Sequence, residues 1–139
     1  MVIQRLQSLY LFIGAVLMVV FLFVPLATTD ASPEAIRPKD FPVYLILNVV
    51  IALIMLIAIF LYKNPKKQKM VTMVSILLIA ASAVTGGLLL YGPNAPQGVV
   101  NIELFGGVML LVITLVLTIA ARRGIARDIK LLSSYDRIR

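Results

Sequence analysis

Hydrophobic and polar residues are separated along this chain into long blocks. Four apolar runs, at 6–29, 41–62, 70–91 and 104–121, contain no Asp, Glu, Lys or Arg. A helix that crosses a hydrocarbon core about 30 Å thick needs roughly 20 apolar residues, and backbone amides in lipid must bond within their own segment. The pattern therefore predicts an all-α, polytopic membrane protein. We expect four transmembrane helices in a bundle, with spans at about 6–28, 42–62, 70–91 and 103–121.

Composition supports lipid as the solvent of this bundle. Hydrophobic residues make up 61% of the 139 residues, more than a compact soluble core of this length requires. An alternative interpretation of the first run is a secretory signal, whose apolar region is about 7 to 15 residues long. Because this run is longer and follows only Arg5, we predict that the first helix is retained.

The basic residues are concentrated in the segments that would share one side of the membrane. Eleven of the 13 Lys and Arg residues lie in the first five residues, in 63–69 and in 122–139, against Arg37 and Lys39 elsewhere. The positive-inside rule then places both termini on the cytoplasmic side of the membrane. Aromatic residues near the predicted helix ends fit an interfacial belt; they are Tyr10, Phe41, Tyr44, Tyr62, Tyr91 and Phe105.

Several classes of chemistry are disfavoured by what the chain lacks. The sequence has no Cys and no His. Thiol chemistry, imidazole-based acid-base catalysis and the usual zinc sites therefore have no ligands or bases here. We predict no catalytic, cofactor or metal site, and the protein is expected not to be an enzyme.

Small side chains mark the third run as a packing surface. Ser82 with Gly86, and Ala83 with Gly87, are spaced four residues apart, which lets a neighbouring backbone approach closely. This surface either packs within the bundle or docks another membrane subunit. The sequence pattern leaves both alternatives open.

Asn48 and Glu103 are a candidate intramembrane polar pair. Asn48 in the second run and Glu103 at the start of the fourth lie at matching depth, so a hydrogen bond between them is geometrically feasible. Such a pair is more often structural than functional. Proton-coupled export of the small multidrug type is disfavoured, because that mechanism needs a carboxylate deep in the first helix.

The segment 122–139 is predicted to be a cytoplasmic amphipathic helix that follows the transmembrane domain, residues 1–121. Ile125, Ile129 and Leu132 share a helix face, with basic residues mainly off it. We expect it to lie on the membrane surface or to bind a partner. Arg5 is a candidate to pair with Asp128 or Asp136, and Gln7 to cap backbone groups of the tail. The full set of candidate partner-binding residues is Arg5, Gln7, Ser82, Gly86, Gly87, Asp128, Asp136, Arg137 and Arg139.

Both ends of the chain carry a recognisable pattern. The first is Ile3-Gln4-Arg5-Leu6-Gln7-Ser8-Leu9-Tyr10-Leu11, and the second is Asp128 followed by Leu131-Leu132, Ser134 and Asp136-Arg137-Ile138-Arg139. The chain resembles, over its whole length, a family of small four-helix inner-membrane proteins of unknown function from Bacteroidota. The resemblance implies a bacterial inner-membrane location and a role that depends on both cytoplasmic ends.

Together these observations favour a non-catalytic accessory or assembly subunit of an inner-membrane complex. The expected partners are membrane lipids and either another membrane protein or further copies of the chain. The alternative is a homo-oligomer that handles a small molecule, a lipid or an ion, with Asn48 and Glu103 as its polar site. Nucleic acid is not expected as a partner, because the positive-inside bias largely explains the net charge of +7.

Overall fold

The computed structural model describes residues 2–29, 32–93, 100–102 and 107–138. Most of these residues are α-helical, as the all-α prediction requires, and short strands and single 3-10 turns connect the helices. The elements in chain order are α1 (Val2–Phe21), β1 (Ala27–Thr29), β2 (Ser32–Ile36), η1 (Pro38–Asp40), α2 (Pro42–Phe60), η2 (Leu61–Lys63), α3 (Pro65–Tyr91), β3 (Val100–Ile102) and α4 (Met109–Ile138).

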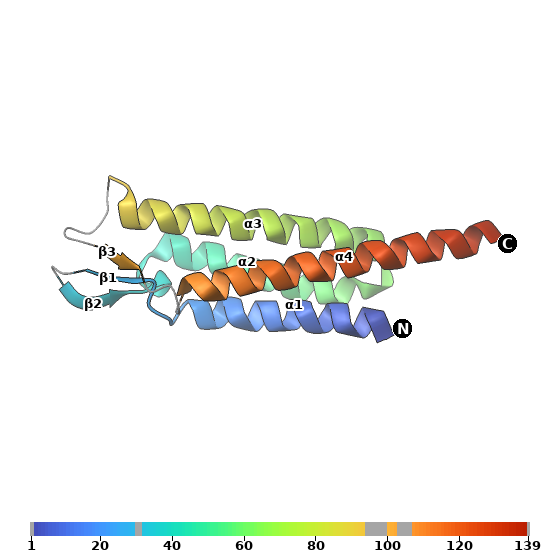
Figure 1. Cartoon of the computed structure of the whole chain (residues 1–139), viewed down its shortest axis with the longest axis horizontal. Helices are drawn as coiled ribbons and strands as arrows, with labels where there is room; N and C mark the ends of the chain where they lie inside the picture. Colours follow the sequence, from blue (N-terminus) through green and yellow to red (C-terminus); the bar gives the residue numbers. More distant parts are fainter. Residues whose placement is uncertain (1, 30–31, 94–99, 103–106, 139) are drawn as a thin grey trace.

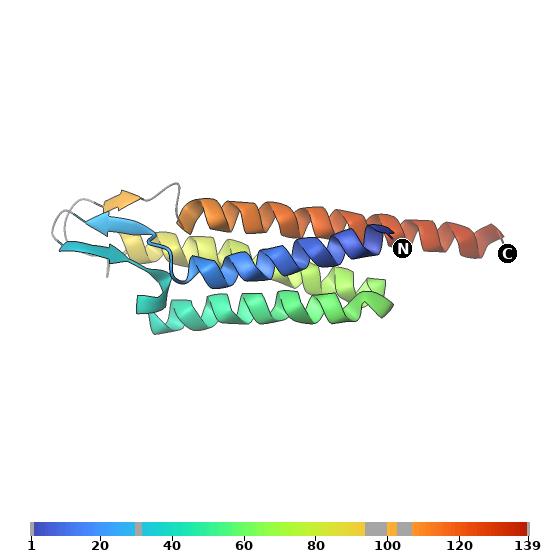
Figure 2. The same ribbon diagram turned by 90° about the horizontal axis from the view of Figure 1, so that it is seen from below.

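The helices are arranged as an antiparallel bundle. Each helix packs against the next one in the chain, and α4 closes the ring by packing against α1 (Figures 1 and 2). Both termini and the turn at η2 lie at one end of the bundle, which we call the basic end. The three strands lie at the opposite end, which we call the sheet end.

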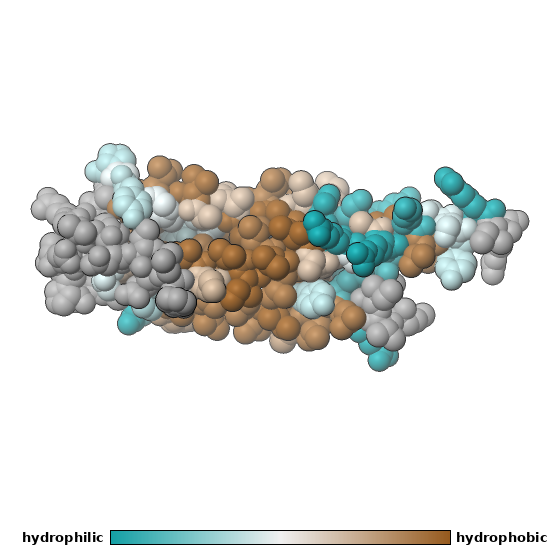
Figure 3. Space-filling view, in the orientation of Figure 1, coloured by the Kyte–Doolittle hydropathy of each residue, from teal (hydrophilic) through white to brown (hydrophobic). Residues whose placement is uncertain are grey.

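Three helices are long and apolar enough to cross a membrane, namely α2 with η2, α3 and α4. The apolar part of α1 within the described residues is shorter, from Arg5 to Phe21. Large apolar side chains are exposed along all four helices, and Figure 3 shows apolar surface between the two ends on the face in view. Polar residues at the basic end border this surface. An apolar exterior of this extent is expected of a protein whose solvent is lipid.

The first helix ends earlier than predicted. The expected span of 6–28 is wrong at its end, because α1 stops at Phe21 and residues 27–29 form β1. Pro25 has no amide hydrogen and disfavours helical geometry at the residue before it, Val24. Thr28 and Thr29 then pair with β3, and β1 is the central strand of a small antiparallel sheet of order β2-β1-β3. The prediction contained no such sheet.

The boundary predicted between the transmembrane domain and the tail is not a structural break. Helix α4 continues without interruption from Met109 to Ile138. Ala121, Ile125 and Asp128 are buried, so the first part of the predicted tail packs against the bundle rather than forming a separate surface helix. Residues from Lys130 to Arg137 are exposed and extend beyond the bundle at the basic end (Figure 1).

Candidate functional site

A cluster of polar side chains joins α2 to α3 in the half of the bundle nearer the sheet end. Ser82 Oγ donates a hydrogen bond to Asn48 Oδ1 at 2.7 Å, and the Asn48 amide donates to the Tyr44 carbonyl at 2.7 Å. Ser82 Oγ also lies 3.3 Å from the Tyr44 hydroxyl. Since serine has one hydroxyl hydrogen, which is used toward Asn48, the Tyr44 hydroxyl must be the donor in that contact. All three side chains are buried.

Tyr44 was expected in the interfacial belt, and that expectation is wrong. Its side chain is only 1% exposed, and its ring packs edge-on against Phe21 with centroids 6.1 Å apart. Asn48 uses its amide and its carbonyl within the Tyr44–Asn48–Ser82 cluster. Glu103 lies outside the described residues, so the Asn48–Glu103 pair stays a prediction. Tyr44 is the residue that sequence reasoning missed, although its four-residue spacing from Asn48 was the available signal.

The two small-residue pairs of α3 lie on different sides of the helix. Ser82 and Gly86 are buried against α2, and a Cβ atom on Gly86 would lie 2.8 Å from the Tyr44 hydroxyl oxygen. Ala83 and Gly87 are exposed, and a Cβ atom on Gly87 would meet no other atom within 4 Å. One pair therefore packs within the bundle, while the other is open on its outer surface.

A second polar contact joins the two ends of the chain. Gln7 Nε2 on α1 donates a hydrogen bond to Asp128 Oδ2 on α4 at 2.9 Å. Both side chains are buried, with Asp128 9% exposed. Gly124, one turn before Asp128, makes room for the Gln7 side chain, since a Cβ atom there would lie 2.9 Å from Gln7 Cγ and Nε2.

This contact revises the pairing expected between the ends. Asp128 is bonded to Gln7 rather than to Arg5, and Gln7 reaches a side chain rather than backbone groups of the tail. Arg5 is exposed on α1, and Asp136 and Arg137 are exposed on the projecting part of α4. Arg139 lies outside the described residues. Of the candidates at the two ends, the structure brings Gln7 and Asp128 together.

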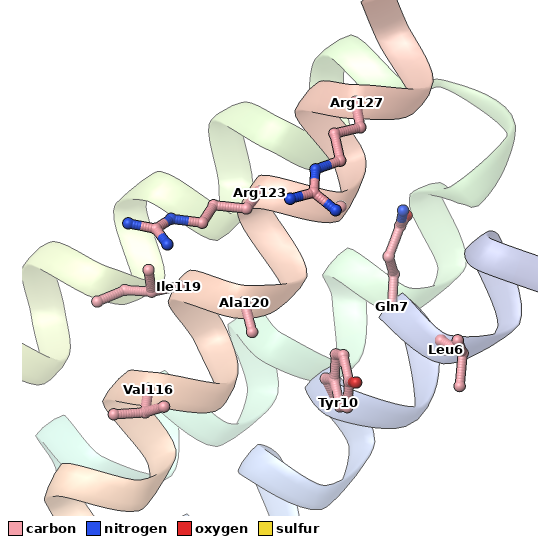
Figure 4. A pocket seen from close by; sticks show the side chains of 9 residues that line it. Leu6, Gln7, Tyr10, Val116, Ile119, Ala120, Arg123 and Arg127 are labelled. Atoms are coloured by element: carbon pink, nitrogen blue, oxygen red, sulfur yellow. The ribbon is translucent and has the colours of Figure 1, made fainter. Parts of the chain in front are cut away.

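A groove lies between α1 and α4 on the outer surface near the basic end. Its volume is about 520 Å³. Figure 4 shows Gln7 and Tyr10 on the α1 side and the side chains of Arg123 and Arg127 extending from α4. The remaining lining residues are mainly apolar; they are Leu6, Val116, Ile119, Ala120 and Gly124. Sequence reasoning placed both arginines off the apolar face of the tail but did not anticipate that they line a groove.

The projecting part of α4 carries exposed apolar side chains. Leu131 and Leu132 are each 50% exposed, and Tyr135 is 68% exposed. Leu132 and Tyr135 continue, at four- and three-residue steps, the side of α4 on which Asp128 is buried. This side of α4 packs against α1 up to Asp128, and beyond Asp128 it is uncovered.

Comparison with known proteins assigns a family but no activity. Residues 3–138 match the family described as Domain of unknown function (DUF4293), so the chain belongs to that family. This confirms the predicted resemblance to an uncharacterised family. The chain matched no curated protein and no solved structure.

Proposed function

We propose that this DUF4293 protein is a non-catalytic accessory or assembly subunit of a bacterial inner-membrane complex. The inner-membrane location is what the resemblance to small Bacteroidota membrane proteins implies. We further propose that α1 crosses the membrane as a fourth span. Its 20 residues correspond to about 30 Å of helix, the thickness of a hydrocarbon core. The bias of Lys and Arg then orients the basic end toward the cytoplasm.

The uncovered side of α4 beyond Asp128 is the observation that carries this proposal. Leu132 and Tyr135 present apolar surface next to charged residues, at a level where α4 has left the bundle. Beyond the bundle this surface would be in contact with water rather than lipid. Burying apolar surface from water against a partner is favourable by roughly 25 cal/mol per Å². A helical segment of a membrane protein partner, docked at the cytoplasmic side, fits this surface.

The outer small-residue surface of α3 provides a second contact for the same partner. Ala83 and Gly87 are exposed at the level of the membrane, where close backbone approach stabilises helix pairs. Hydrophobic burial contributes little to helix association in lipid, so small residues, which allow close backbone packing, stabilise helix pairs there more than large apolar residues do. The two surfaces together would engage a partner both within the membrane and at its cytoplasmic face.

Affinity purification from the native membrane tests the proposal. The variant Leu132→Gln/Tyr135→Gln alters two exposed side chains and leaves the Gln7–Asp128 contact intact. We expect one stoichiometric membrane protein with the wild type and its loss with this variant. The matched control, Ser133→Gln/Ser134→Gln, places the same side chains on neighbouring exposed positions and should retain the partner.

One result would contradict the proposed binding surface on α4, and another would contradict the accessory role itself. Equal recovery of the partner with both double variants would show that this side of α4 does not bind it. Recovery of a homo-oligomer alone would favour the second candidate, a protein that handles a lipid or another small molecule. The groove between α1 and α4 is the observation that supports that candidate.

A further inference from the structure

The groove between α1 and α4 combines an apolar surface with a basic one. Leu6, Val116 and Ile119 form its apolar walls, and two arginines, Arg123 and Arg127, form its border toward the basic end. Its volume of about 520 Å³ is within the range of typical ligand sites, about 300–1,000 Å³. An occupant must therefore offer apolar and anionic parts at opposite ends.

We propose that this groove binds an anionic phospholipid, with the phosphodiester headgroup at Arg123 and Arg127 and an acyl chain along the apolar walls. The inference rests on the membrane placement proposed above but does not depend on the accessory role. Lipid is the source of phosphate that satisfies both parts of the groove, because a soluble phosphate would leave the apolar walls exposed.

Within the described part of the chain, no acidic side chain forms an ion pair with Arg123 or Arg127. Arg123 and Arg127 are one turn apart and both exposed, so their like charges face the same side of α4. Asp128 adjoins Arg127 in sequence, but its carboxylate is buried and bonded to Gln7. Guanidinium binds phosphate oxygens through paired hydrogen bonds, which makes arginine better suited than lysine to a defined headgroup site.

The basic side of α4 continues past the groove. Lys130, Ser134 and Arg137 follow Arg127 at three- and four-residue steps, so they extend the same side of the helix. A second hollow of about 390 Å³ is lined by Arg127, Lys130, Leu131 and Ser134 and shares Arg127 with the groove. This continuation favours a headgroup with hydroxyl or further phosphate groups, such as phosphatidylglycerol, over a zwitterionic one.

The position of the groove matches the headgroup level of a bilayer. Along α4 the arginines directly follow the apolar lining residues Val116 and Ile119, and Figure 3 shows the apolar surface of the bundle giving way to polar residues at the basic end. Tyr10 lines the groove from α1, and tyrosine is enriched at this level of membrane proteins. Basic pockets between helices on this side of membrane proteins recur as sites for anionic headgroups.

Native mass spectrometry of the purified protein tests the site with phosphatidylglycerol and phosphatidylcholine of identical acyl chains. We expect wild-type protein to prefer phosphatidylglycerol at least about tenfold. The variant Arg123→Gln/Arg127→Gln should bind it about thirtyfold more weakly, which corresponds to about 1 kcal/mol for each basic residue. The matched control, Lys66→Gln/Lys67→Gln, removes two exposed charges of α3 that also lie at the basic end. It should bind phosphatidylglycerol within about twofold of wild type.

A third variant separates the groove from general attraction to basic side chains. Ala120→Phe fills the apolar part of the groove without changing any charge, and it should weaken phosphatidylglycerol binding while unfolding at the wild-type temperature. Wild-type binding by Ala120→Phe would overturn the proposal, as would equal losses in the two double variants or no preference between the lipids. Displacement of the lipid by an equal concentration of soluble glycerophosphoglycerol would also overturn it, because the site would then be one for free phosphate.

Discussion

Substitution of Gly124 by alanine should reveal how the two ends of the chain are coupled. The new Cβ atom would lie 2.9 Å from both Cγ and Nε2 of Gln7, which real Cβ contacts do not tolerate. Gln7 must therefore shift, and we expect its 2.9 Å hydrogen bond to Asp128 to be lost. Gly124→Ala thus acts on stability through a residue on another helix.

The expected magnitude follows from two opposing contributions. Alanine is favoured over glycine in a helix by about 0.8–1 kcal/mol. A hydrogen bond to a carboxylate is worth about 1.5–3 kcal/mol in soluble proteins, while interhelical hydrogen bonds in membranes average nearer 0.6 kcal/mol. Because Asp128 stays buried when its donor leaves, we expect the loss to be about 2 kcal/mol and the net destabilisation about 1 kcal/mol.

The sign of the effect should reverse in a Gln7→Ala background. There the Gln7 side chain and its hydrogen bond are already gone, so Gly124→Ala should stabilise the protein by up to about 1 kcal/mol through helix propensity alone. The assay is reversible unfolding in mixed micelles with increasing dodecyl sulfate, followed by far-ultraviolet circular dichroism. Equal effects of Gly124→Ala in the two backgrounds, within about 0.5 kcal/mol, would refute the reasoning, because independent sites are additive to that degree.

Three further predictions concern residues of α3 and use the same unfolding assay. Gly86→Ala should destabilise by about 1–3 kcal/mol, because its Cβ would meet the Tyr44 hydroxyl, and Tyr44→Phe should relieve most of that cost. Gly87→Ala should be neutral or slightly stabilising, so similar losses at both glycines would contradict the described packing. Ser82→Ala should cost about 0.6–1.7 kcal/mol, because Asn48 Oδ1 loses its donor; an unchanged stability would show that the hydrogen bond contributes nothing.

The helical runs were predictable because lipid constrains the backbone so strongly. The predicted second span, 42–62, agrees with α2 and η2, and the third, 70–91, ends with α3 at Tyr91. The return of both termini to the same end follows from an even number of antiparallel helices joined by short connections. Two predicted boundaries were wrong because hydropathy does not mark where these helices end. The first helix ends at Phe21 because of backbone geometry, and α4 continues past Ala121 because of helix propensity.

The candidate site was predictable only in part. Gln7 and Asp128 were both singled out, but their contact spans 121 residues of sequence, and no helical periodicity specifies which turn of α4 faces which turn of α1. The α1–α4 groove depends on that same register. Arg123 and Arg127 could therefore be read as basic residues of a tail, but not as the border of a groove.

The sequence by itself determined the solvent, the helices and the basic end, because an apolar run of about 20 residues has few stable states other than a helix in lipid. Tertiary structure decided which side of each helix faces inward. Ser82–Gly86 and Ala83–Gly87 have the same spacing in the sequence, yet one pair is buried and the other exposed. In a soluble protein hydrophobicity would have distinguished them. Around this bundle the exterior is as apolar as the interior, so the choice rests on the fit of Tyr44 against Gly86 and of Asn48 against Ser82.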